Sequence, residues 1–190
     1  MGEACIRPVM TSHGDGVYRS NDGGDSWVHI GLDESRTISS LVIHPKDHNV
    51  VYVGVQGDQY QASKSRGVYR SVDGGKNWEK VFYVNEFSGV SGLSMDRNNP
   101  RILYASFWDH QRKPWQMRSG GEGSGIYKST DGGTTWKKLS KGLPEKMGKT
   151  DVSVSGANSK RVYVIAEAEK GGLFRSDDGG KSFKLSLIHI

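Results

Sequence analysis

Four aspartates recur in one short motif, Ser-x-Asp-Gly-Gly, and they are the carboxylates whose spacing invites a chemical interpretation. They are Asp22, Asp73, Asp131 and Asp178, which lie 51, 58 and 47 residues apart. Carboxylates bind metal ions and act as acids or bases. Here each one directly precedes two glycines that favour a turn, where a carboxylate accepts hydrogen bonds from the turn's own N–H groups. We therefore expect these aspartates to be structural.

The complete motif is twelve residues long and occurs four times without gaps. The copies are GVYRSNDGGDSW, GVYRSVDGGKNW, GIYKSTDGGTTW and GLFRSDDGGKSF, at residues 16–27, 67–78, 125–136 and 172–183. Five alternating residues predict a strand, Asp-Gly-Gly a turn, and the final aromatic residue the start of the next strand. The residues expected to build the four corners are Ser20, Asp22, Gly24, Trp27, Ser71, Asp73, Gly75, Trp78, Ser129, Asp131, Gly133, Trp136, Ser176, Asp178, Gly180 and Phe183.

A second group of polar and aromatic residues lies in the least repetitive segment, residues 108–124. Flat aromatic rings suit sugar rings or peptide side chains, and arginines suit carboxylates. The sequence therefore predicts a ligand site there, with Asp58 and Tyr60 of the preceding repeat lining the same groove. The alternative is that Trp115 packs beneath its own loop and that the glycine run is only a hinge. The candidates in this segment are Trp108, Asp109, Arg112, Trp115 and Arg118.

The intervals between motifs must supply the elements that position these residues. Each contains two apolar or alternating runs, such as residues 38–44 and 50–55, separated by turn-forming residues. A period near 50 residues matches one four-stranded propeller blade. The fold class is therefore all-β, with about three antiparallel four-stranded blades plus a partial first blade. We assign residues 1–190 to one incomplete β-propeller domain, divided at 16–36, 37–89, 90–149 and 150–190.

Strand direction places the candidate groups on opposite faces. Strands alternate up and down in a blade, so the Asp-Gly-Gly turns share one face with the turns between first and second strands. The long, dissimilar segments 56–66, 85–89, 108–124 and 141–149 then share the other face. Long loops on a rigid scaffold commonly carry function, so we expect ligand on that face.

Composition excludes several classes of protein. Apolar residues make up 34% of the chain, glycine contributes 26 residues, and the net charge is +5. The basic residues are scattered and no nucleic-acid motif is present, so no nucleic-acid partner is expected. One cysteine, Cys5, precludes an internal disulfide, and no apolar run approaches the ~20 residues of a membrane span. The histidines show no metal-ligand spacing, so neither a metal nor a cofactor is expected.

The four copies resemble the bacterial-neuraminidase repeat, or Asp-box, over residues 15–183. Proteins with this repeat include sialidases, xyloglucan-cleaving glycosidases, sortilin-type sorting receptors and a photosystem assembly factor. Three segments look closest to bacterial secreted proteins described as glycosyl hydrolases or sortilin-like. They are VVYVGVQG, the segment from ILYASFWDH to GGTTW, and RVYVIAEAEKGGLFRSDDGG. This resemblance implies a propeller in a secreted, periplasmic or envelope protein.

Two functions stay open at this level. The first is a binding or scaffold module for a peptide, protein or glycan; the alternative is part of a sialidase-like or xyloglucanase-like glycoside hydrolase. No catalytic set of either hydrolase transfers residue by residue, so catalytic residues stay unassigned and the binding module is preferred. Fewer blades than the ~4–8 of a closed ring predict a truncated chain partnered by the rest of its propeller. The apolar run at 185–190 is expected to depart from the natural repeat.

Overall fold

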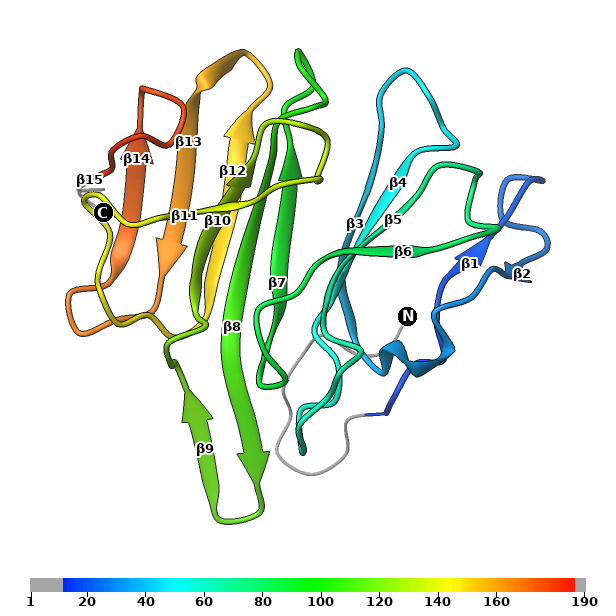
Figure 1. Ribbon diagram of the computed structural model, residues 1–190, viewed down its shortest axis with the longest axis horizontal. Helices are drawn as coiled ribbons and strands as arrows, with labels where there is room; N and C mark the ends of the chain where they lie inside the picture. Colours follow the sequence, from blue (N-terminus) through cyan, green and yellow to red (C-terminus); the bar gives the residue numbers. More distant parts are fainter. Residues whose placement is uncertain (1–11, 187–190) are drawn as a thin grey trace.

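A computed structural model describes residues 12–186, and within them the chain forms four antiparallel sheets arranged side by side (Figure 1). The predicted all-β class of blade-like sheets with Asp-box turns is confirmed. A short 3-10 helix, η1 (Asp33–Ser35), joins the first two sheets and was not predicted. Cys5 lies outside the described residues, as do residues 187–190 of the tail.

Within each sheet the strand order follows the chain order and successive strands pair, apart from one strand of the third sheet that branches off this path. The first sheet holds β1 (Tyr18–Arg19) and β2 (Val28–His29). The second holds β3 (Ile38–Ile43), β4 (Val51–Val55), β5 (Gly67–Ser71) and β6 (Glu79–Phe82). The third holds β7 (Ser88–Met95), β8 (Leu103–Lys113), β10 (Gly125–Ser129) and β11 (Lys137–Leu139), with β9 (Gln116–Ser119) paired to β8. The fourth holds β12 (Thr150–Ser155), β13 (Asn158–Ala166), β14 (Gly172–Ser176) and β15 (Lys184–Leu185).

The Asp-box turns close the outer hairpin of each sheet with the hydrogen bonds that the motif predicts. In the second copy the Asp73 carboxylate accepts the backbone N–H of Asn77 at 2.9 Å, while Ser71 Oγ accepts that of Gly75 at 2.8 Å. Gly74 and Gly75 have φ values of 70° and 91°, which side chains with a Cβ rarely adopt. The other three copies repeat these bonds.

Three apolar clusters lie between successive sheets. Alternate residues of each strand face opposite neighbours, so a sheet in the middle contributes to two clusters. On β4, for example, Val53 and Val55 pack toward the first sheet and Tyr52 toward the third. The core is therefore a row of inter-sheet layers.

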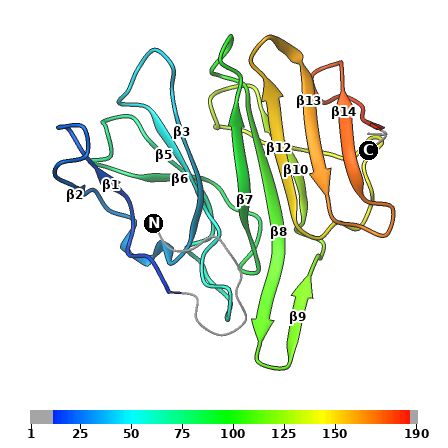
Figure 2. The ribbon, with the colours of Figure 1, turned by 180° about the vertical axis from the view of Figure 1, so that it is seen from behind.

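The predicted placement of the turns is also observed. The N–H groups of Gly74, Gly132 and Gly179 donate to carbonyls at the first hairpin of the same sheet, those of Asn49, Arg101 and Lys160. Asp-box turns and first-to-second turns therefore share one face. The β8–β9 hairpin extends from the opposite end of its sheet, as both views show (Figure 1 and Figure 2).

Candidate functional site

The most prominent feature of the long-segment face is the β8–β9 hairpin. We expected residues 108–124 to form a loop, whereas β8 continues to Lys113 and pairs with β9 from His110–Ser119 to Lys113–Gln116. Residues 108 and 109 pair with β7, and residues 110–113 continue the strand because β9 pairs with them there. Trp115 lies at the hairpin tip with 79% of its surface exposed, so the alternative in which it packs beneath its own loop is excluded.

The base of this hairpin is held by the residues that we expected to contact ligand. Trp108 is 2% exposed and donates its Nε1–H to Ser119 Oγ at 3.0 Å. Asp109 is nearly buried and forms an ion pair of 2.8 Å with Arg118, and its N–H donates to Ser124 Oγ. Trp108 and Asp109 therefore fix the hairpin and offer little surface to a ligand.

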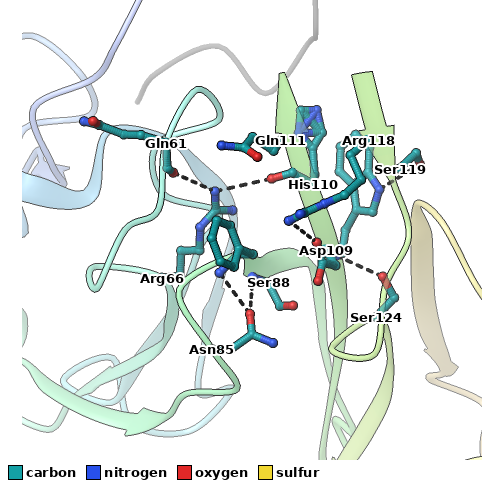
Figure 3. A network of polar contacts seen from close by, with 12 residues as sticks. Gln61, Arg66, Asn85, Ser88, Asp109, His110, Gln111, Arg118, Ser119 and Ser124 are labelled. Atoms are coloured by element: carbon teal, nitrogen blue, oxygen red, sulfur yellow. Dashed lines mark hydrogen bonds and ion pairs between the residues drawn. The ribbon is translucent and has the colours of Figure 1, made fainter. Parts of the chain in front are cut away.

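Arg66 links the second and third sheets and is a residue that the sequence analysis missed. It is fully buried, and its Nη1 donates to the carbonyl of Gln56 at 2.7 Å. Its Nη2 donates to the carbonyl of Asp58. The same Nη2 donates to the carbonyls of Gln61 and, on β8, of His110 (Figure 3). Burial lowers the pKa of Arg66 to about 10, which leaves the guanidinium charged at neutral pH. A glycine at φ 79°, Gly57, lets the loop pass over this side chain.

The loop that Arg66 holds contains Asp58 and Tyr60, and the structure brings both beside β8. Asp58 is nearly buried and accepts the N–H of Tyr60 at 2.8 Å, so its carboxylate shapes the loop. Tyr60 is 37% exposed, and its carbonyl accepts the amide of Gln111 at 3.4 Å. Arg112 donates its N–H to the carbonyl of Gln59. The segments of neighbouring sheets thus meet here, whereas their lining of one ligand groove stays a prediction.

His110 completes the buried part of this region. Its ring lies 4.0 Å from that of Trp108 between centroids and is fully buried. Burial and then the charge of Arg66 lower the pKa of His110 to about 4, so the ring is neutral at physiological pH. Neither ring nitrogen has a hydrogen-bond partner within the described part of the chain.

A groove of about 800 Å³ lies beside the hairpin, between the third and fourth sheets. Its lining is rich in carboxylates: Glu122, Glu145, Glu167 and Glu169. Glu167 accepts the Ser119 hydroxyl and the Lys149 N–H, each at 2.8 Å, which fixes its carboxylate between the hairpin and the fourth sheet. Of these four, only Glu122 lies in the segment 108–124 in which the sequence predicts a ligand site.

Asp151 is a second carboxylate that sequence analysis passed over. It lines an adjoining groove with Lys149 and Glu167, at the start of the innermost strand of its sheet. In the two preceding sheets the equivalent position is occupied by Ser39 and Ser91. The Ser39 hydroxyl donates to the carbonyl of Val90, and the Ser91 hydroxyl to that of Thr150, each at 2.6 Å. Burial raises the pKa of Asp151. The absence of a Cβ on Gly92 gives the carboxylate its space.

Neither metal binding nor membrane insertion finds support in residues 12–186. In this range no three His, Cys, Asp or Glu side chains come together as a metal site. Nor does any helix there have the length and apolar character needed to cross a membrane. The four motif aspartates are occupied by the hydrogen bonds of their own turns.

Comparison with known proteins agrees with this architecture. The family model described as "BNR/Asp-box repeat" matches residues 69–80 and 127–138, within the second and third motif copies. The chain therefore carries Asp-box repeats in sheets of the β-propeller type.

Similar proteins include several xyloglucanases. A xyloglucanase of Acetivibrio thermocellus is 26% identical over 89% of this chain and 23% of its own length. One from a Paenibacillus species is 26% identical over 92% of this chain and 15% of its own length. Among solved structures, an ancestral GH74 enzyme has a TM-score of 0.71 at 18% identity, covering 93% of this chain and 22% of that one. The GH74 xyloglucanase of Xanthomonas campestris has a TM-score of 0.69 at 20% identity, covering 91% and 27%.

The chain therefore spans about a quarter or less of these relatives. At sequence identities of 18% and 20%, the similarity to solved structures establishes the fold alone. Of the two functions left open by the sequence, the similarity favours the glycoside hydrolase over the preferred binding module.

Proposed function

We propose that this chain forms blades of a larger glycoside hydrolase that acts on a xyloglucan-type polysaccharide outside the cell or in its envelope. The observation that carries the proposal is sequence similarity to xyloglucanases along about nine-tenths of the chain, at 26% identity. The groove on the long-segment face supplies a place for the polysaccharide.

The shape of this face suits an extended sugar chain. The groove of about 800 Å³ is open along the β9 side of the hairpin and holds both hydrogen-bonding groups and the apolar Met147. At the hairpin tip, Trp115 presents an exposed ring on which a sugar ring stacks, and Arg112 lies on the neighbouring strand. Trp115 and Arg112 remain our predicted contacts.

The chemistry of glycoside hydrolysis requires two carboxyl groups with different protonation states. Asp151 is our candidate for the protonated acid, because partial burial raises its pKa and an aspartate replaces the repeat's serine. Glu167 is the candidate for the second carboxyl group, because hydrogen bonds from the Ser119 hydroxyl and the Lys149 N–H hold it in place. Both line the adjoining groove, and Glu167 also lines the groove of about 800 Å³.

The second candidate is a glycan-binding blade set without a catalytic role. The observation that favours it is the exposed aromatic hairpin, which needs no placed carboxylates to bind a sugar chain. Both candidates predict polysaccharide binding, and they differ in the effect of the carboxylates.

The test is affinity electrophoresis of the full 190-residue chain in gels containing xyloglucan, with mannan as the control polysaccharide. We expect selective retardation by xyloglucan. In a longer protein carrying this segment, Asp151→Asn and Glu167→Gln should abolish release of reducing ends while retardation persists. Equal mobility in both gels would contradict both candidates. Unchanged hydrolysis by both variants would contradict the catalytic role of the two carboxylates and leave the glycan-binding blade set as the remaining candidate.

Trp115→Ala should weaken this binding by about 2 kcal/mol, a typical loss for an exposed aromatic anchor. Its folding should be unaffected, because the ring is 79% exposed. Lys76→Ala is the matched control, since Lys76 is exposed on the opposite, Asp-box face. If Lys76→Ala weakens retardation and Trp115→Ala does not, ligand binds the other face.

A further inference from the structure

A groove of about 340 Å³ lies between the outer strand of the third sheet, β11, and the Asp-box turn of the fourth sheet. Five of the residues that line it are lysines, and we call it the lysine groove. They are Lys128, Lys137, Lys138, Lys141 and Lys181. The groove lies between two four-stranded sheets of this chain. A further sheet would pack on the other side of the fourth sheet and would leave the lysine groove open.

The positive charge of the lysine groove is not balanced by ion pairs. Within residues 12–186 none of its five lysines forms an ion pair with a carboxylate. The Asp178 carboxylate of the adjoining turn is occupied by the N–H and the hydroxyl of Ser182. Burial and then the charge of Lys181 lower the pKa of Lys128. A ligand that brings negative charge would relieve this repulsion.

The equivalent place between the second and third sheets carries a different set of residues. When the copies are aligned on the Asp box, the counterparts of Lys128, Lys137, Lys141 and Lys181 are Arg70, Glu79, Tyr83 and Thr134. Arg70 and Glu79 form an ion pair of 2.8 Å, so the charge there is largely balanced. The junction between two sheets therefore forms without an excess of lysines. Packing of the sheets does not explain the lysine groove, whereas binding of an anion does.

The lining of the lysine groove selects the kind of anion. Among the described residues its charged groups are all lysines, and a lysine ammonium binds an anion as a single point charge. Phosphate and sulfate are commonly bound by free backbone N–H groups. Here the Gly179 N–H donates to the carbonyl of Lys160. The Gly180 N–H donates to Ser176 Oγ at 2.9 Å, so neither is free.

The same lining argues against nucleic acid. Proteins that bind single strands usually stack the bases on aromatic side chains, and no aromatic side chain of the described residues lines the lysine groove. Its other members are Leu139, Ser140 and two glycines. Separate ammonium groups beside a hydroxyl suit a chain of hydroxylated units that each carry one carboxylate.

We propose that the lysine groove binds an acidic polysaccharide of the polyuronate class, with Lys137, Lys141 and Lys181 pairing with its carboxylates. These three side chains are exposed and reach such a chain without rearrangement of the sheets. The proposal does not rest on the proposed hydrolase activity. Among the described residues, the lysine groove shares only Lys138 with the groove of about 800 Å³ and contains none of its carboxylates.

Calorimetric titration of the full 190-residue chain with oligogalacturonate tests the proposal. We expect binding whose affinity falls as salt is added, because exposed ion pairs are screened. Lys137→Glu should weaken binding more than about tenfold, since it replaces an attraction by a repulsion. The fold should tolerate it, because Glu79 holds this position in the second sheet. Lys46→Glu is the matched control: it makes the same change of charge at an exposed position in the β3–β4 turn and should alter affinity less than about twofold.

A second variant and three other anions complete the test. Lys181→Thr introduces the residue that the third copy has at this position and should weaken binding about threefold. Melts by circular dichroism should match the wild type for every variant, and retardation by xyloglucan should persist in Lys137→Glu. Absence of oligogalacturonate binding, or an equal loss in Lys46→Glu and Lys137→Glu, would overturn the proposal. Tighter binding of dextran sulfate, an oligodeoxynucleotide or anionic lipid vesicles than of oligogalacturonate would overturn it as well.

Discussion

At the scale of single residues, the serine and the aspartate of each Asp box divide the hydrogen bonds of the turn between them. Ser71 Oγ accepts the N–H groups of Asp73 and Gly75 and donates to the Asp73 carboxylate. The carboxylate accepts the backbone and side-chain N–H groups of Asn77. Each group depends on the other, so the turn is a small closed network.

Ser71→Ala should reduce the free energy of unfolding by ~1–3 kcal/mol, because it leaves the buried Gly75 N–H without an acceptor. Ser20→Ala makes the same change in the first copy, where the turn is exposed and water can replace the hydroxyl. Urea unfolding of the two variants measures the difference. A larger loss for Ser20→Ala would show that burial is not the cause.

Stability should fall as the pH drops from about 4 to about 2. Hydrogen bonds from the Asn77 backbone, the Asn77 side chain and Ser71 lower the pKa of Asp73 from 3.8 to about 2. The folded pKa lies below the unfolded one, so the stabilisation is present above the unfolded pKa and is lost as the pH falls through the folded pKa. Thermal melts at several pH values should show a smaller slope for Asp73→Asn.

Asp25→Asn is the control for this titration. Asp25 lies in the first Asp-box turn, and its substitution by Asn removes the same charge. In the described residues, however, no hydrogen bond joins its side chain to the turn. Melts of both variants are recorded over the same pH range. An Asp73→Asn slope equal to that of Asp25→Asn would mean that the turn hydrogen bonds do not control acid stability.

At the scale of elements, the β8–β9 hairpin owes its position to a buried arginine in a neighbouring sheet. Arg66 donates to carbonyls of its own loop and to His110 on β8, while Asp109 and Arg118 pair across the hairpin. The exposed tip is thus carried on a base that is closed to solvent. We expect the tip to keep its orientation when ligand binds.

Arg66→Met should destabilise the chain by ~2–3 kcal/mol, because the buried carbonyls of Gln56 and Asp58 lose their donor. Hydrogen exchange should rise in residues 56–66 and along β8 from His110 onwards. Arg97→Met, which also removes an arginine but at an exposed position, should change neither quantity. Unaltered exchange on β8 would show that the hairpin stands without Arg66.

At the scale of the whole molecule, stability resides in the layers between sheets. Each layer requires close approach of neighbouring innermost strands, and Gly54 marks one such approach. Its hypothetical Cβ would lie 2.5 Å from Val90 Cγ1 and 2.8 Å from Ser40 Oγ. The spacing of the second and third sheets is set at this position.

Gly54→Ala should therefore destabilise the chain by ~1–3 kcal/mol through overpacking. Gly156→Ala is the matched control, since a Cβ there has no neighbour within 4 Å. Thermal melts of both variants make the comparison. A melting temperature unaffected by Gly54→Ala would mean that the sheets can shift apart at little cost.

The sequence by itself determined the repeating architecture. Asp-Gly-Gly turns and alternating strands are local properties, because hydrogen bonds and φ preferences within about eight residues define them. The opposition of short turns and long segments also followed from strand direction alone. The hairpin tip residue Trp115 was predicted and is exposed, though its contact with ligand stays a prediction.

Only the tertiary structure decided which candidates reach the surface and which groups meet. Trp108 and Asp109 are buried because β9 folds back beside β8, and no local sequence pattern predicted β9. Arg66, Glu167 and Asp151 acquire their surroundings from segments tens of residues away, which sequence spacing cannot bring together. Local hydrogen bonds depend on residues close together in the sequence, whereas burial and the pairing of charges depend on which sheets pack side by side.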